Sequence, residues 1–92
     1  MSNQNRLNAI AETITSLAME QFHENKAIID HTRQRKDSVE YHLTNGFIID
    51  CATFTNFSSG MPVDVMTVVS LINDMGETLK EIKFSMNLFK GE

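Results

Sequence analysis

The sequence predicts an α+β fold in which one long N-terminal helix packs on a four-stranded antiparallel β-meander. Two observations support this prediction. In the first third of the chain, apolar residues recur with the period of about 3.6 residues that is typical of an amphipathic helix. From about residue 38 onward they alternate with polar residues, as in half-buried strands. The length of 92 residues suits a single domain that spans the whole chain.

The helix is expected to extend from about residue 3 to about residue 34. Ser2 or Asn3 can serve as its N-cap, and neither proline nor glycine interrupts it. A helix of this length measures about 48 Å, which exceeds the diameter of roughly 32 Å expected for a compact chain of this size. We therefore expect its last turns to be partly exposed, with a bend near Gln21 and Asn25 as the alternative.

Four strands are expected, at about residues 38–44, 47–57, 63–73 and 78–89. Asn45-Gly46 separates the first two, and this dipeptide between alternating runs is the strongest short-range signal for a two-residue type I′ turn. Such a turn sets up three cross-strand pairs: Leu43 with Ile48, Tyr41 with Asp50, and Val39 with Ala52. Residues 58–62 form a connecting loop by composition.

Residues 63–73 admit two interpretations. Their many β-branched side chains favour a strand, whereas Ser59, Pro62 and Gly76 could instead frame a helix. The alternating pattern that follows at residues 82–88 requires a hairpin partner, so we favour the strand.

The second expected strand carries apolar residues on both faces, while a single helix covers only one face of a sheet. One set consists of Ile48, Ala52 and Phe54, and the second set consists of Phe47, Ile49 and Cys51. The second set either packs under loops or forms an apolar patch for self-association or partner docking.

The chain offers no clear constellation of residues for catalysis, metal binding or cofactor binding. Its single cysteine, Cys51, excludes an internal disulfide and is expected to act as a small buried hydrophobe. The alternative is a nucleophile paired with His42 as base. His23 and His31 lie about 12 Å apart along the expected helix, too far to bind one metal. We therefore expect no enzymatic activity, no metal and no cofactor.

Arg33, Arg35 and Lys36 form the only dense cluster of charge. At the end of the expected helix they either stabilise its C-terminal carbonyls or contact phosphate or an acidic protein surface. Phe57 and Met61 are expected near a loop tip, where exposed aromatic and thioether groups can insert into a partner. These residues are the candidate partner-binding residues.

The formal net charge of −4 provides no global basic field of the kind that marks a nucleic-acid binder. The chain shows no signal-peptide pattern, and no apolar run approaches the roughly 20 residues that cross a bilayer. We therefore expect a cytoplasmic protein whose cysteine is reduced, with no membrane association.

In size, acidity and expected architecture the whole chain resembles small phage-encoded host-takeover proteins, including the anti-CRISPR inhibitors. The resemblance includes no sequence motif, so it assigns no role to any residue. It implies a protein that occupies a surface of a larger nucleoprotein complex, such as a CRISPR-Cas surveillance complex, and blocks recruitment of target nucleic acid. In a phage-encoded protein, the site of action would be the cytoplasm of the host cell.

The expected function is therefore that of a non-enzymatic inhibitor that binds a host protein or nucleoprotein complex, with RNA contact through the basic helix end. The alternative is a self-assembling structural or adaptor protein, a homodimer formed through the exposed sheet face and the helix end. A third hypothesis, a small enzyme that uses Cys51 and His42, predicts a thiol that reacts readily near neutral pH.

Overall fold

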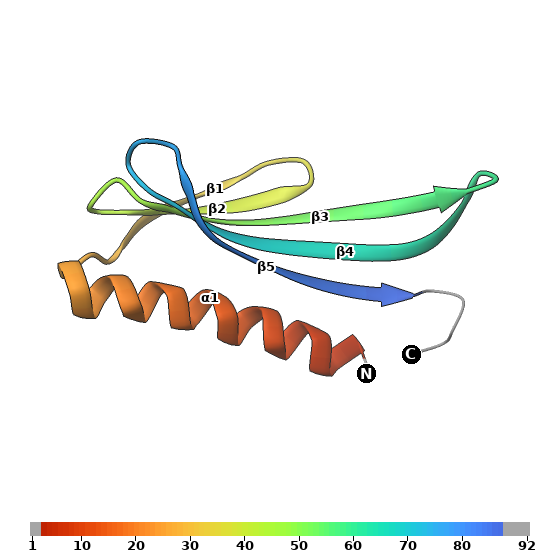
Figure 1. The fold of residues 1–92 in the computed structure, drawn as a ribbon, viewed down its shortest axis with the longest axis horizontal. Helices are drawn as coiled ribbons and strands as arrows, with labels where there is room; N and C mark the ends of the chain where they lie inside the picture. The colour runs from red at the N-terminus through yellow and green to blue at the C-terminus, as the bar shows by residue number, and fades with distance from the viewer. Residues whose placement is uncertain (1–2, 88–92) are drawn as a thin grey trace.

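The computed structural model describes residues 3–87, which form one helix packed against an antiparallel sheet (Figure 1). The helix α1 spans Asn3–Asn25. The sheet has five strands in chain order: β1 (Ile29–Gln34), β2 (Ser38–Leu43), β3 (Ile48–Ser58), β4 (Met61–Ile72) and β5 (Thr78–Asn87). The predicted α+β class and antiparallel meander are confirmed. The predicted number of four strands is wrong, because the sheet has five.

The additional strand comes from the segment that was expected to complete the helix. The helix ends at Asn25 rather than near residue 34, and residues 29–34 form β1. Lys26 has a φ of 58°, and its N–H donates to the carbonyl of Phe22 at 2.9 Å. This is a left-handed helix cap, a position that glycine or asparagine usually occupies. Because lysine takes it here, the sequence carries no recognisable stop signal at this point.

The end of α1 is also fixed by a buried side chain. Oε1 of Gln21 accepts hydrogen bonds from Nδ2 of Asn25 at 2.9 Å and from Nδ2 of Asn45 at 3.1 Å. Asn45 belongs to the turn between β2 and β3, so these bonds hold the end of the helix against the sheet. In place of the predicted long helix, or of its alternative with a bend at Gln21 and Asn25, the chain reverses just beyond these two residues.

The turn between β2 and β3 differs from the predicted two-residue turn. The N–H of Leu43 donates to the carbonyl of Phe47 at 2.8 Å, and Gly46 donates to the carbonyl of Leu43 at 3.0 Å. Gly46 has a φ of 90°, whereas the φ of Asn45 is not positive, so a type I′ turn is excluded. The loop has three residues, 44–46. It shifts the register by one, to the pairs Val39 with Cys51, Tyr41 with Ile49, and His42 with Ile48.

This shift determines which face of β3 the helix covers. Ile49 is fully buried and Cys51 packs against the core, while Phe54 on the alternate face is 49% exposed. The second set of apolar residues on this strand therefore faces α1, and the first set lies on the face that α1 leaves open, the reverse of the expectation. The buried core consists of Ile10, Leu17, Ala27, Leu43, Ile49, Val69 and Leu71.

Residues 63–73 were expected to form a strand, and this is confirmed, since β4 extends over Met61–Ile72. The loop expected at 58–62 is instead a tight turn. Ser58 pairs with Met61, and the two residues between them, Ser59 and Gly60, both have positive φ, of 54° and 80°. This is the type I′ geometry predicted for Asn45-Gly46. As a result the β3–β4 hairpin remains paired to its tip and extends past the N-terminal end of α1 (Figure 1).

The last predicted strand, about 78–89, corresponds to β5, and residues 88 and 89 lie outside the described part of the chain. In residues 3–87, no helix is long and apolar enough to cross a membrane. The molecule is elongated, with extents of 45 × 23 × 20 Å.

Candidate partner-binding surface

The basic cluster lies on a strand and a turn rather than at a helix end. Arg33 is the fifth residue of β1, and Arg35 and Lys36 belong to the turn between β1 and β2. The N–H of Arg35 donates to the carbonyl of Ser38 at 2.8 Å and closes this turn. The interpretation that these cations stabilise the C-terminal carbonyls of the helix is therefore wrong. In the alternative of a homodimer through the sheet face and the helix end, the helix end would be at Asn25, away from these cations.

The three cations of this cluster differ in how they are engaged. Nε of Arg35 lies 3.0 Å from Oε2 of Glu40 and forms an ion pair with it. Arg33 is opposite Glu40 in the register of β1 and β2, but within residues 3–87 neither Arg33 nor Lys36 forms an ion pair. Both are exposed. Their charges are thus available to a partner near the β1–β2 turn.

The β3–β4 hairpin presents the candidate apolar residues. Phe57 is 64% exposed and Met61 is 57% exposed, and both lie next to the tight turn at the tip. A β-bulge between Asn56 and Phe57 interrupts the register there, and Nδ2 of Asn56 donates to Oδ1 of Asp64 across the two strands. The tip is therefore an ordered, paired structure that holds large apolar side chains in solvent.

The fold brings the basic turn and the hairpin together. A groove of about 430 Å³ is lined by Lys36, Asp37, Thr53, Phe54, Thr55 and Phe57. The N–H of Thr53 donates to the carbonyl of Asp37 at 2.9 Å and anchors the turn against β3. Of the candidate residues, Lys36 and Phe57 line this groove, while Arg33, Arg35 and Met61 do not.

Sequence reasoning missed the other residues of this groove, Thr53, Phe54 and Thr55. They line it because β2 is 6 residues long and β3 is 11 residues long, so part of β3 extends past its neighbour. The unequal lengths expected for the strands at 38–44 and 47–57 already contained this signal.

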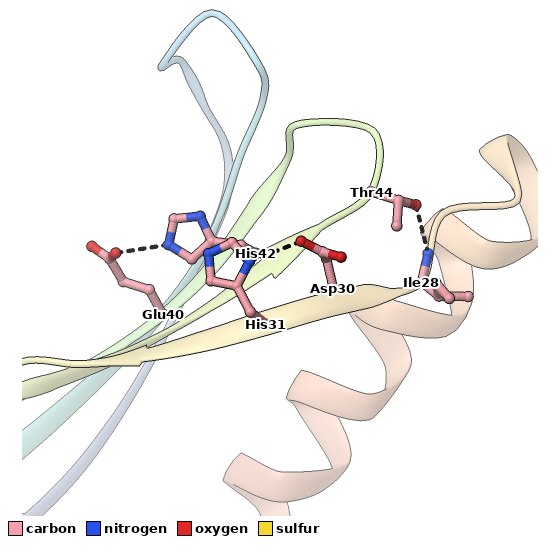
Figure 2. A network of polar contacts seen from close by, with 6 residues as sticks. All are labelled: Ile28, Asp30, His31, Glu40, His42 and Thr44. Atoms are coloured by element: carbon pink, nitrogen blue, oxygen red, sulfur yellow. Dashed lines mark hydrogen bonds and ion pairs between the residues drawn. The ribbon is translucent and has the colours of Figure 1, made fainter.

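A second polar cluster lies nearby, on β1 and β2 (Figure 2). The imidazole rings of His31 and His42 stack with a centroid separation of 4.5 Å and an interplanar angle of 10°. Nδ1 of His31 donates to Oδ2 of Asp30 at 2.9 Å, and Nε2 of His42 donates to Oε1 of Glu40 at 3.0 Å. At the start of β1, the N–H of Ile28 donates to Oγ1 of Thr44 at 3.1 Å. The stacked rings and the bond from Ile28 to Thr44 join β1 to β2, whereas each histidine–carboxylate bond lies within one strand.

In and beside this cluster, the pKa values of two neighbouring carboxyl groups are shifted in opposite directions. The hydrogen bond from His42 lowers the pKa of Glu40 against the opposing effect of burial, and the positive charge of Arg35 lowers it further. Asp50 lies opposite Glu40 on β3. Burial raises the pKa of Asp50, and the negative charge of Glu40 raises it further. Both oxygens of Glu40 are engaged by His42 and Arg35, which suits a structural role.

The proposed pairing of Cys51 with His42 is not formed. Cys51 is opposite Val39 and contacts the core under α1, whereas His42 is opposite Ile48 and bonds to Glu40 on the other face. Burial raises the pKa of the Cys51 thiol, and the charge of Asp50 adds to this effect. Both effects disfavour the thiolate that a nucleophile requires. Among residues 3–87, no group of three or more His, Cys, Asp or Glu side chains is placed to hold a metal ion.

Comparisons with protein-family models, with curated proteins and with solved structures return no match for this chain. The candidate surface therefore rests on its own geometry: a groove that joins Lys36 of the β1–β2 turn to the exposed Phe57 of the β3–β4 hairpin.

Proposed function

We propose that this protein is a non-enzymatic inhibitor that docks on a larger nucleoprotein complex and blocks the recruitment of target nucleic acid. The observation that supports the proposal best is the position of Lys36 and Phe57 on one groove, with Arg33 and Met61 in the same two hairpins. A binding surface needs apolar anchors surrounded by polar groups that confer orientation, and these two hairpins offer both.

The apolar side chains supply the affinity. Large aromatic groups that become fully desolvated at the centre of an interface typically account for most of its binding energy. Phe57 is 64% exposed and held on a paired hairpin, so little conformational freedom is lost when a partner covers it.

The charges supply orientation. Arg33 and Lys36 can pair with acidic side chains or phosphates at the rim of the interface, where charges mainly affect association rate and specificity. The rest of the chain is acidic: from residue 47 onward it contains three lysines and six aspartates or glutamates. That acidic half matches the basic groove in which a nucleoprotein complex holds its target. Such an inhibitor acts in the cytoplasm, as the resemblance to anti-CRISPR proteins implies.

Binding to a panel of purified CRISPR-Cas surveillance complexes tests this proposal. The wild-type protein is immobilised and the retained complexes are quantified, together with the Lys36→Glu and Phe57→Ser variants. We expect at least one complex to be retained in stoichiometric amount, and each variant to lower its affinity by roughly tenfold or more, since about 1.4 kcal/mol corresponds to tenfold.

Two matched controls separate the surface from general effects. Lys83→Glu reverses a charge on β5, and Met75→Ser removes an exposed apolar group from the turn between β4 and β5. Neither control should change retention. Retention of no complex by the wild-type protein would contradict the proposal, and so would equal retention by all four variants.

A further inference from the structure

The sheet has an open edge in addition to the outer edges of β1 and β5. The pairing of β2 with β3 ends at Ser38 and Ala52, whereas β3 continues to Ser58. Residues 53–58 therefore have β4 on one side and, within the described chain, no strand on the other. Figure 1 shows this part of β3 extending beyond the short β1–β2 hairpin.

The backbone groups on this edge are directed away from β4. The N–H of Thr53 points toward the β2 side, since it donates to the carbonyl of Asp37 at 2.9 Å. Backbone direction alternates along a strand, so Thr55, two residues further on, presents its N–H and C=O on the same side. Within residues 3–87, no strand lies there to pair with these two groups. Such an edge is a template for pairing with another strand.

The three edges of the sheet differ in charge. Charged or ionisable side chains occur along the outer strand β1, at Asp30, His31 and Arg33, and along β5, at Lys80, Glu81 and Lys83. Charges of this kind discourage edge-to-edge association. The open part of β3 reads Thr-Phe-Thr-Asn-Phe-Ser and contains neither a charge nor a proline. It is the one edge of the described sheet without these protective features.

Two grooves beside this edge could receive the side chains of an added strand. The groove that contains Phe54 and Phe57 is accompanied by a second groove of about 340 Å³, lined in part by Val39, Cys51 and Thr53. Both grooves also include Lys36, Asp37 and Thr55, so they are adjacent along the same edge. Alternate side chains of an added strand would enter the two grooves in turn.

We propose that this edge pairs with the same edge of a second copy of the chain. The open segments of the two copies, Thr53–Ser58, run antiparallel about a two-fold axis and join two five-stranded sheets into one. A second copy fits because the segment is uncharged and therefore meets itself without like charges in opposition. This applies even though each chain carries a net charge of −4. The pairing also covers Phe54 and Phe57, which are 49% and 64% exposed in the single chain.

The dimer has a consequence for the partner-binding surface. Because the two strands are antiparallel, the hairpin tip of each copy, with its Met61, lies beside the basic turn of the other. The groove with Lys36 and Phe57 cannot hold the strand of a second copy and another partner at once, so the dimer and the complex of the proposed function exclude each other. The dimer does not depend on the proposed function, since it involves the chain alone.

Sedimentation velocity of the full chain over a wide concentration range tests this inference. Thr55→Pro removes the edge N–H without removing a bond of the β3–β4 ladder, because that N–H points away from β4. Thr55→Val retains the N–H and serves as the matched control. We expect a concentration-dependent dimer for wild type and Thr55→Val. For Thr55→Pro we expect a dissociation constant at least about tenfold higher, as loss of edge hydrogen bonds implies.

Amide hydrogen exchange of Thr55 provides a second measurement that does not require the proline variant to fold. We expect this amide to exchange more slowly as the wild-type concentration rises. A wild-type protein that is monomeric at every concentration would overturn the inference. A dimer that leaves the Thr55 amide unprotected would overturn it as well. Retention of surveillance complexes is measured separately, so failure of one proposal is distinguishable from failure of the other.

Discussion

Arg6 of α1 is buried beneath the helix, and its Nη2 donates to Oγ1 of Thr67 in β4 at 2.7 Å. The same nitrogen lies 3.4 Å from the carbonyl oxygen of Phe84 in β5. Nε of Arg6 has no hydrogen-bond partner in the described structure. The guanidinium thus links the helix to the sheet through neutral acceptors. Burial of its charge without an anionic partner is unfavourable. Its position near the positive N-terminal end of the helix is unfavourable as well.

Arg6→Met is expected to stabilise the protein, because it fills similar volume without burying a charge. Replacing a buried ion pair by apolar groups of similar volume is often neutral or stabilising by about 1–4 kcal/mol. Because only neutral acceptors offset the buried charge of Arg6 within residues 3–87, we expect a gain near the lower end of this range. Urea unfolding measures the difference. Arg6→Ala, which leaves a cavity, should not show the gain. A large loss of stability in Arg6→Met would mean that the bond to Thr67 outweighs the cost of the buried charge.

Lys26→Gly is expected to stabilise the helix end. Lys26 has a φ of 58°, and this left-handed conformation costs a residue with a Cβ roughly 1–2 kcal/mol. Glycine avoids this cost, but it loses more conformational entropy on folding, which offsets part of the gain. We expect a net gain of about 0.5–1 kcal/mol in thermal or urea unfolding. Lys26→Ala is the control, since it also removes the contact of Lys26 with the Phe22 ring but retains a Cβ. Equal stability of the glycine and alanine variants would contradict the assigned cap.

The neighbouring carboxyl groups on β2 and β3 predict opposite pH effects. Folding lowers the pKa of Glu40. Its contribution to folding stability is therefore present at pH values above the pKa of the unfolded state, and it is lost as the pH falls through the pKa of the folded state. Folding raises the pKa of Asp50, so the folded state favours its protonated form. The resulting contribution to folding stability is lost as the pH rises through the pKa of Asp50 in the folded state. At neutral pH, Glu40→Gln should therefore lower the melting temperature and Asp50→Asn should raise it.

Both differences should shrink in acid, where the two wild-type carboxyl groups are protonated. Melting curves recorded from neutral to acidic pH provide the measurement. Changes of the same sign in the two variants at neutral pH would contradict the opposite pKa shifts assigned to Glu40 and Asp50.

Cys51 is expected to react slowly with thiol reagents in the native protein near neutral pH. Burial and the charge of Asp50 raise the pKa of its thiol, so little thiolate is present. The labelling rate should rise steeply with pH and should approach that of a free cysteine on unfolding. Rapid labelling of the native protein at neutral pH would revive the hypothesis of a nucleophilic cysteine.

Sequence periodicity was sufficient to predict the fold class and the strand nature of residues 63–73. Both follow from hydrophobic patterning, which reports burial directly. The helix end and the turn registers were not predictable in the same way. Lys26 in a left-handed cap and the three-residue loop 44–46 lie on either side of a tertiary bond, from Asn45 to Gln21, that no local pattern contains.

The candidate residues were recognised as unusual from composition, but their arrangement was not. Lys36 and Phe57 meet because β1 and β2 form a short hairpin beside the longer β3–β4 hairpin. A helix over residues 29–34 would not have placed Lys36 beside the β3–β4 hairpin. The open edge at Thr53–Ser58 was not predictable for the same reason, because residues 29–34 were expected to be helical and form β1 instead.

Competition for target nucleic acid tests the central claim most directly. A retained surveillance complex is incubated with increasing amounts of the protein, and its binding of labelled target is measured by electrophoretic mobility. We predict that target binding is lost at a stoichiometric ratio for wild type and Lys83→Glu, and persists with Lys36→Glu or Phe57→Ser. Undiminished target binding at saturating amounts of the wild-type protein would contradict the proposed inhibition.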